Sequence, residues 1–178
     1  MKSLFALSIF VLASSSTASM AEEQNLGLGF VEAPASGSTP LGLTDVPKTV
    51  MHAAMVALKT EASLTGFESA ELDRDEIEAV YELKARMPDG RAIEVDVSTA
   101  GVILEIEKEI LKTTVPSQVI QALDAYFPDF KADPKGVQIE KSIRPAGNNL
   151  LEVWYEFAGQ DFDAEIRSDA RVIVIEPA

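Results

Sequence analysis

"VPKTV" at residues 46–50 and "VPSQV" at residues 115–119 share the pattern Val-Pro-x-x-Val. A residue that can cap a helix, Asp45 or Thr114, stands directly before each copy. Proline is tolerated in the first turn of a helix because its missing N–H would have no intrahelical partner there. Each copy therefore predicts the start of a helix.

Apolar residues continue from both copies at the spacing of one helix face. They are Val46, Val50, Ala53, Ala54, Ala57 and Leu58 in the first predicted helix, and Val115, Val119, Ala122, Leu123, Tyr126 and Phe127 in the second. Pro128 is expected to end the second helix. Each helix is thus predicted to cover a sheet with one buried face.

The segments after each helix alternate between apolar and polar residues, which predicts antiparallel strands with one solvated face. The expected strands are 67–72, 81–85, 93–97 and 102–107 in the first half, and 137–143, 151–157, 162–166 and 172–176 in the second. The two halves differ in length mainly at turns, as expected of a duplicated fold. The prediction is an α+β fold with two tandem helix-plus-four-stranded-antiparallel-sheet modules, at 45–110 and 114–178. Whether the modules share one sheet is left open.

The first 21 residues resemble a secretory signal peptide. Lys2 is followed by an apolar run and then by small residues around Ala21. The apolar run is shorter than the roughly 20 residues that cross a bilayer. Residues 22–44 are rich in Gly, Pro and Ser and are predicted to form a flexible arm, although its apolar residues at 26–31 could instead add a short strand to a sheet edge.

The charge of the chain is strongly negative, with a formal net charge of −14 at pH 7. Removal of the signal peptide would take away one positive charge and leave −15. Such a protein repels nucleic acid and anionic membranes. The chain contains no Cys, which excludes disulfides and a lipid anchor on cysteine. We therefore predict a periplasmic or secreted protein that is not inserted in a membrane after signal cleavage and that binds no nucleic acid.

Several of these motifs together resemble a known family. Val-Pro before an Ala-rich helix, Tyr81-Glu82, the turn at Gly90 and the final Val-Ile-Leu-Glu-Ile-Glu of residues 102–107 are similar to PepSY-type domains, and to the PepSY-like periplasmic proteins related in fold to the β-lactamase inhibitory protein. The resemblance covers 46–109 well and 115–177 less well. It implies an exported, non-enzymatic module that binds or inhibits peptidases, with no catalytic residue to transfer.

The residues themselves also give no catalytic site. His52 is the only histidine and falls on the polar side of its predicted helix, where a solvated side chain is expected. Without Cys and with one His, zinc and copper sites of the usual ligand types are excluded. We expect no cofactor and no catalytic residue. A hydrolase with paired carboxylates is disfavoured because the acidic residues alternate along solvated strands.

Trp154 is the strongest candidate for binding a partner protein, since it shares a strand face with Glu152 and Glu156. Glu94 and Asp96 are predicted to extend this acidic surface. The alternative is that Trp154 packs between the modules or under the arm. A second hypothesis is a cation- or small-ligand-binding protein, because carboxylates at 94, 96, 105 and 107 could converge on calcium. An acidic face that only keeps the sheet soluble would show the same pattern.

Overall fold

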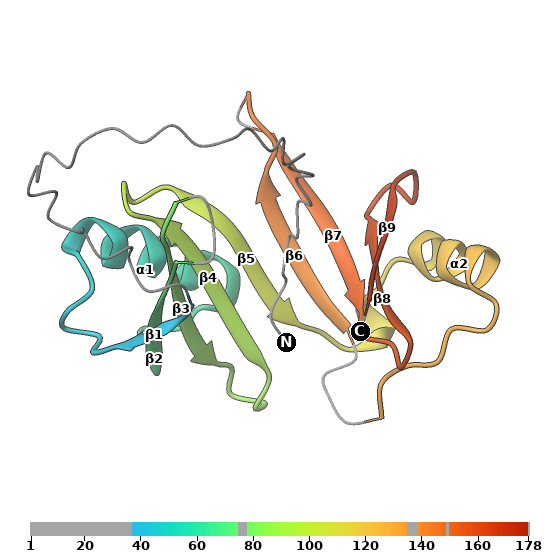
Figure 1. Ribbon diagram of the computed structural model, residues 1–178, viewed down its shortest axis with the longest axis horizontal. Helices are drawn as coiled ribbons and strands as arrows, with labels where there is room; N and C mark the ends of the chain where they lie inside the picture. Colours follow the sequence, from blue (N-terminus) through green and yellow to red (C-terminus); the bar gives the residue numbers. More distant parts are fainter. Residues whose placement is uncertain (1–36, 75–77, 135–138, 149, 178) are drawn as a thin grey trace, which may run out of the picture. The chain divides into compact units, whose positions relative to one another are not determined.

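The computed structural model describes residues 37–74, 78–134, 139–148 and 150–177. Nine strands pair in chain order and antiparallel to form one sheet (Figure 1). Their bounds are β1 Thr39–Leu41, β2 Ser69–Asp73, β3 Val80–Arg86, β4 Ala92–Ser98, β5 Ile103–Glu109, β6 Ile139–Pro145, β7 Leu151–Phe157, β8 Phe162–Arg167 and β9 Ile173–Pro177. All eight predicted strands are present within a few residues of their expected bounds, and β1 is additional.

The prediction of two tandem helix-plus-four-stranded-sheet modules is wrong, because all nine strands belong to one sheet. β5 and β6 pair with each other, with Ile106 opposite Ile143 and Glu109 opposite Glu140. This pairing joins the strands of both halves into a single open sheet. The physical reason is that β5 and β6 both offer backbone groups at what would be module edges, and an unpaired edge is costly. The α+β class is retained, with two short helices, α1 Lys48–Ala62 and α2 Ser117–Tyr126.

Both helices begin directly after the proline of the Val-Pro pair rather than including it. Pro47 and Pro116 have ψ angles of 140° and 137°, which is extended backbone, and they stand at the capping position. No side chain caps either helix, so Asp45 and Thr114 do not have the predicted role. The hydroxyl of Thr114 instead donates to the backbone oxygen of Leu111 at 2.7 Å, beside the short 3-10 helix η1 Lys112–Thr114.

Two apolar clusters lie on the side of the sheet that carries the helices. α1 packs against β4 and β5, and α2 packs against β8. The first cluster includes Val50, Leu58, Leu83, Ile93, Val95 and Val97, and the second includes Val119, Leu123, Ile139, Phe157, Ala164 and Ile166. Tyr126 was predicted on the buried face of its helix but is 68% exposed, because α2 ends at that residue.

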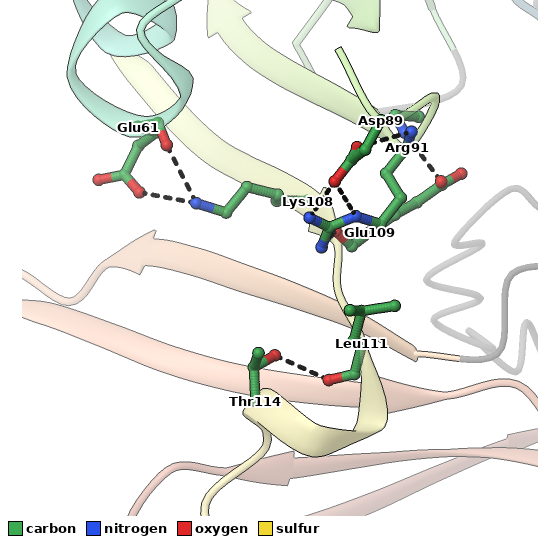
Figure 2. A network of polar contacts seen from close by, with 8 residues as sticks. Glu61, Asp89, Arg91, Lys108, Glu109, Leu111 and Thr114 are labelled. Atoms are coloured by element: carbon green, nitrogen blue, oxygen red, sulfur yellow. Dashed lines mark hydrogen bonds and ion pairs between the residues drawn. The ribbon is translucent and has the colours of Figure 1, made fainter. Parts of the chain in front are cut away.

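Polar contacts tie the C-terminal end of β5 to its surroundings (Figure 2). Lys108 Nζ donates to the backbone oxygen of Glu61 at 3.1 Å and lies 3.5 Å from its carboxylate, which connects β5 to the last turn of α1. Arg91 donates to Asp89 at 2.9 Å and to the backbone oxygen of Glu109 at 3.1 Å. The end of β5, where the chain leaves toward α2, is therefore held by α1 through Lys108 and by Arg91 through Glu109.

The predicted signal peptide, 1–21, lies outside the described residues, as does most of the predicted arm. The described part of the arm contains β1, which pairs with β2 and places Thr39 opposite Leu72. Ser38 supports this pairing because its hydroxyl donates to Glu71 at 2.7 Å. Neither of the described helices is long and apolar enough to cross a membrane.

Candidate functional site

The sheet face opposite the helices carries mainly charged residues, and we call it the acidic face. Successive side chains of a strand point to opposite faces of the sheet, so these side chains point away from the face that carries the core residues. The carboxylates of the acidic face are Glu71, Asp73, Glu82, Glu94, Asp96, Glu105, Glu107, Glu109, Glu140, Glu152, Glu156, Asp163, Glu165 and Glu176, and its cations are Lys84, Arg86, Arg144 and Arg167.

The register of the strands aligns the carboxylates in two rows that cross the sheet. The first row consists of Glu71, Glu82, Asp96 and Glu105, each directly opposite the next on β2 to β5. The second row consists of Glu109, Glu140, Glu156 and Glu165 on β5 to β8. Like charges directly opposite each other destabilise a sheet. The rows therefore carry an energetic cost that a face serving only solubility would not need.

Several carboxyl groups of the acidic face have a raised pKa. Partial burial is the largest cause, and neighbouring carboxylates add to it. Burial and Glu94 raise the pKa of Glu82 to about 7, and burial with Glu94 and Glu105 raises that of Asp96 to about 8. By the same causes the pKa of Glu107 is raised to about 10. These groups hold protons at a pH where ordinary carboxyls are ionised.

Glu156, in the second row, behaves in the same way. Burial and the neighbouring Glu140 raise its pKa to about 7. The pKa of Glu140 is itself raised, first by burial and then by nearby carboxylates. Raised pKa values therefore occur in both rows rather than at one isolated residue.

Arg144 is the cation that connects the two rows. Its Nε lies 2.7 Å from Glu105, at the end of the first row, and its Nη1 lies 2.8 Å from Glu165, at the end of the second. Nη2 also donates to Glu165 at 3.2 Å, so that pair is bidentate. Glu165 is only 4% exposed. Ser142, which is buried, donates its hydroxyl to the same Glu105 oxygen. Together these contacts link β5, β6 and β8.

Asp96 has an unsatisfied oxygen. Its Oδ1 is buried and has no hydrogen-bond partner within the described part of the chain. An oxygen in this position can be satisfied by a proton, a cation or a donor from a bound partner. Nevertheless, the described residues contain no group of three or more His, Asp or Glu side chains arranged to hold a metal ion.

The five residues predicted to bind a partner all lie on the acidic face, but in different surroundings. Glu94 pairs with Lys84 at 3.4 Å, and Glu156 lies in the second row. Trp154 is only 8% exposed, which favours the packing alternative over an exposed anchor. Its ring lies 5.7 Å from the guanidinium carbon of Arg144.

The remaining predicted residue, Glu152, accepts a hydrogen bond from Trp154 Nε1 at 3.2 Å and pairs with Arg167 at 3.3 Å. It thus holds the indole ring in place rather than standing free for a partner. His52 is exposed on α1, as its place on a solvated helix side predicts.

Sequence reasoning missed Arg144, Ser142 and Glu165, which form the centre of the acidic face. Alternation along each strand placed them on a polar face, so their orientation was available from the sequence. Their convergence depends on the pairing of β5 with β6, which the sequence left open. The register between halves was the missing information.

No family model matches the chain, and comparison with curated proteins gives no match. The chain is similar to a solved structure from Bacteroides thetaiotaomicron, described as that of a "putative calcium-regulated periplasmic protein". The two chains share 15% sequence identity, and the similarity covers 78% of this chain and 96% of the other, with a TM-score of 0.35. A similarity of this strength defines neither the fold nor the function of this chain, which are argued from its own residues.

Proposed function

We propose that the protein is an exported, non-enzymatic binding protein that engages a basic protein partner through its acidic face. The observation that carries the proposal is the pair of carboxylate rows, in which directly opposed acids outnumber the cations that could neutralise them. Lys and Arg side chains of a partner would relieve this repulsion. Part of the binding free energy would thus come from relief of the repulsion between carboxylates in the free protein.

A periplasmic or secreted location is proposed, since the predicted signal peptide favours it. A peptidase is the class of envelope enzyme to test first, because the resemblance to PepSY-type domains implies it. The negative charge of the whole chain, −14, would add long-range attraction for a basic partner and make the association sensitive to salt.

The proposal predicts that a deca-lysine peptide, as a minimal basic ligand, binds the acidic face. Titration calorimetry at about 20 mM NaCl is expected to show binding that is lost at about 0.5 M NaCl. The double variant Glu82→Gln/Glu156→Gln changes one member of each row, and at about pH 8, where both carboxyls are mostly ionised, it should weaken binding at least about tenfold. Its fold should be retained, because both changes reduce repulsion between opposed carboxylates.

The matched control is Asp124→Asn/Asp129→Asn, which removes two negative charges at exposed positions away from the acidic face. It should leave the affinity within about twofold of the parent protein, since it changes only the long-range field. Equal weakening by both double variants would show that net charge alone attracts the peptide, and would contradict a site on the sheet.

A divalent cation is a second candidate ligand, favoured by the unsatisfied oxygen of Asp96 between the carboxylates of Glu82 and Glu105. If calcium binds there, about 2 mM CaCl2 should raise the melting temperature by several degrees more than NaCl of matched ionic strength. Asp96→Asn should abolish the difference. A melting temperature that responds equally to the two salts would reject this candidate and leave the protein-binding proposal standing.

A further inference from the structure

The two edges of the sheet differ in how far they are protected. β1, at one edge, has three residues and carries Pro40, which lacks an N–H donor. Short edge strands and proline are devices that prevent further strand pairing. β9, at the other edge, consists of Ile173, Val174, Ile175, Glu176 and Pro177, and none of the described strands pairs with its outer side. Only its last residue is a proline, so the interior of β9 is open to pairing.

The hydrogen-bond register identifies which backbone groups of β9 point outward. Arg167 N–H donates to the Val172 oxygen at 3.0 Å, so these two residues form a hydrogen-bonded pair. Such pairs alternate along an antiparallel ladder. Val174 therefore bonds to Glu165 on β8, whereas the N–H and C=O groups of Ile173 and Ile175 point away from the sheet. β9 thus offers two donors and two acceptors at its open edge.

The side chains of β9 give each face of this edge a different chemistry. Ile173 and Ile175 lie on the helix side, and Ile175 is 57% exposed. Glu176 lies on the acidic face directly opposite Asp163, so a pair of opposed carboxylates stands at the edge of the sheet. Val174, which is 38% exposed and lies opposite Glu165, shares that face with Glu176. A tenth strand would therefore meet apolar surface on the helix side, and Val174 with the negative charge of Glu176 on the other.

We propose that an extended segment of the basic partner, with alternating apolar and Lys or Arg residues, adds to the sheet as a tenth strand along β9. This rests on the proposed function and specifies how the partner is recognised. Residues of the segment opposite Ile173 and Ile175 would exchange backbone hydrogen bonds with them and place apolar side chains on the helix side. The alternate residues would place their cations beside Glu176, continuing the acidic face.

A second copy of the chain fits this edge less well. Antiparallel self-pairing would bring together two chains that each carry a net charge of −14. Pairing Ile173 with Ile175 of the other copy would also set Glu176 opposite Val172, where no cation compensates the carboxylate. The charge of the edge therefore selects a basic segment over self-association.

The probe is the synthetic peptide acetyl-Val-Lys-Val-Lys-Val-Lys-Val-amide, titrated into 15N-labelled protein at low salt. Amide exchange is the decisive measurement. The outward amides of Ile173 and Ile175 should exchange rapidly in the free protein and slow at least about tenfold with bound peptide. The inward amide of Val174 should be protected in both states. The same peptide with N-methylated valines has equal charge but cannot donate to β9, and it should bind at least about tenfold more weakly.

Two variants of Ile175 separate backbone pairing from side-chain contact. Ile175→Pro puts a ring in place of an outward N–H without breaking a bond to β8. The ring obstructs the approach of a further strand, so the unmethylated peptide should bind this variant as weakly as the methylated one does. Ile175→Ala keeps the donor and should retain the difference between the two peptides. The deca-lysine peptide has no apolar residues for the helix side of β9 and is expected to bind only the acidic face. It should therefore bind Ile175→Pro as it binds the parent protein.

Other results would overturn the proposal in recognisable ways. If the methylated and unmethylated peptides bind equally and both are weakened by Glu82→Gln/Glu156→Gln, the acidic face binds cations but no strand is added. If neither these peptides nor deca-lysine binds at low salt, the proposed function itself fails. A dimer of the free protein that Ile175→Pro dissociates would assign the edge to a second copy instead.

Discussion

Replacing Arg144 with Met is expected to lower the free energy of unfolding by about 3–5 kcal/mol. The guanidinium makes a bidentate pair with Glu165, whose side chain is almost completely buried, and a further contact to Glu105. Without Arg144 the carboxylate of Glu165 would remain buried and uncompensated, directly opposite Glu156. The loss would also remove the cation that lies near the ring of Trp154.

Urea denaturation followed by circular dichroism and by Trp154 fluorescence would measure this loss. The double variant Arg144→Met/Glu165→Leu should recover a large part of the stability, because it removes the buried carboxylate of Glu165 as well as the guanidinium that compensated it. Arg167→Met is the control, since Arg167 pairs with Glu152 and Asp169 near the surface and its loss should change stability little. Equal losses for Arg144→Met and Arg167→Met would refute a special role for the central network.

The position of Arg144 also explains how the sheet can carry its carboxylate rows at all. Glu105 ends the first row and Glu165 ends the second, so one guanidinium pairs with the last carboxylate of each row. The other members of the rows have weaker compensation: Lys84 lies 3.6 Å from Glu82 and is shared with Glu94. The face is therefore anchored at its centre and electrostatically unsatisfied toward both sides, where a basic partner would contribute most.

Much of the fold could be predicted because it depends on local signals. Alternation along each strand and the Val-Pro starts of both helices are readable in short windows of sequence. The joining of the halves was not predictable in this way, because β5 and β6 are separated by η1 and α2 along the chain. Ile106 and Ile143 would be buried equally well in two packed sheets or in one continuous sheet. Only their direct pairing distinguishes these arrangements.

The candidate site was predictable in composition but not in detail. The strand periods correctly placed Glu94, Asp96, Glu152, Trp154 and Glu156 on polar faces. The exposure of Trp154 was not predictable, because it depends on Arg144 from the neighbouring strand. The opposition of Glu82 to Asp96, and of Glu140 to Glu156, is likewise a property of register between strands. Such contacts come from tertiary pairing, about which composition carries no information.

Raising the pH from about 5 to about 9 is expected to destabilise the free protein. In the folded state the pKa of Glu107 is about 10, that of Asp96 is about 8, and those of Glu82 and Glu156 are about 7, all above the ordinary values of these groups. Between the ordinary and the folded pKa the native state binds more protons than the unfolded state. The free energy of unfolding therefore falls as pH rises through this window.

The contribution of one carboxyl group shows how large this fall in the free energy of unfolding should be. A carboxyl that stays protonated in the fold over three pH units, while it ionises in the unfolded chain, changes stability by about 4 kcal/mol. Glu107 meets this condition between pH 5 and 8. Urea denaturation across this range at constant ionic strength should show the decline. Glu107→Gln should flatten it, whereas Asp124→Asn, on the exposed side of α2, should leave the slope unchanged.

The same titration connects stability to binding. A basic partner favours the ionised carboxylates, so association should release protons near pH 7 and should strengthen as pH rises, while the free protein becomes less stable. Calorimetry of deca-lysine binding in buffers of different ionisation enthalpy would count these protons. A free protein whose stability rises from pH 5 to 9, or a complex that forms without proton release, would contradict the electrostatic account of the acidic face.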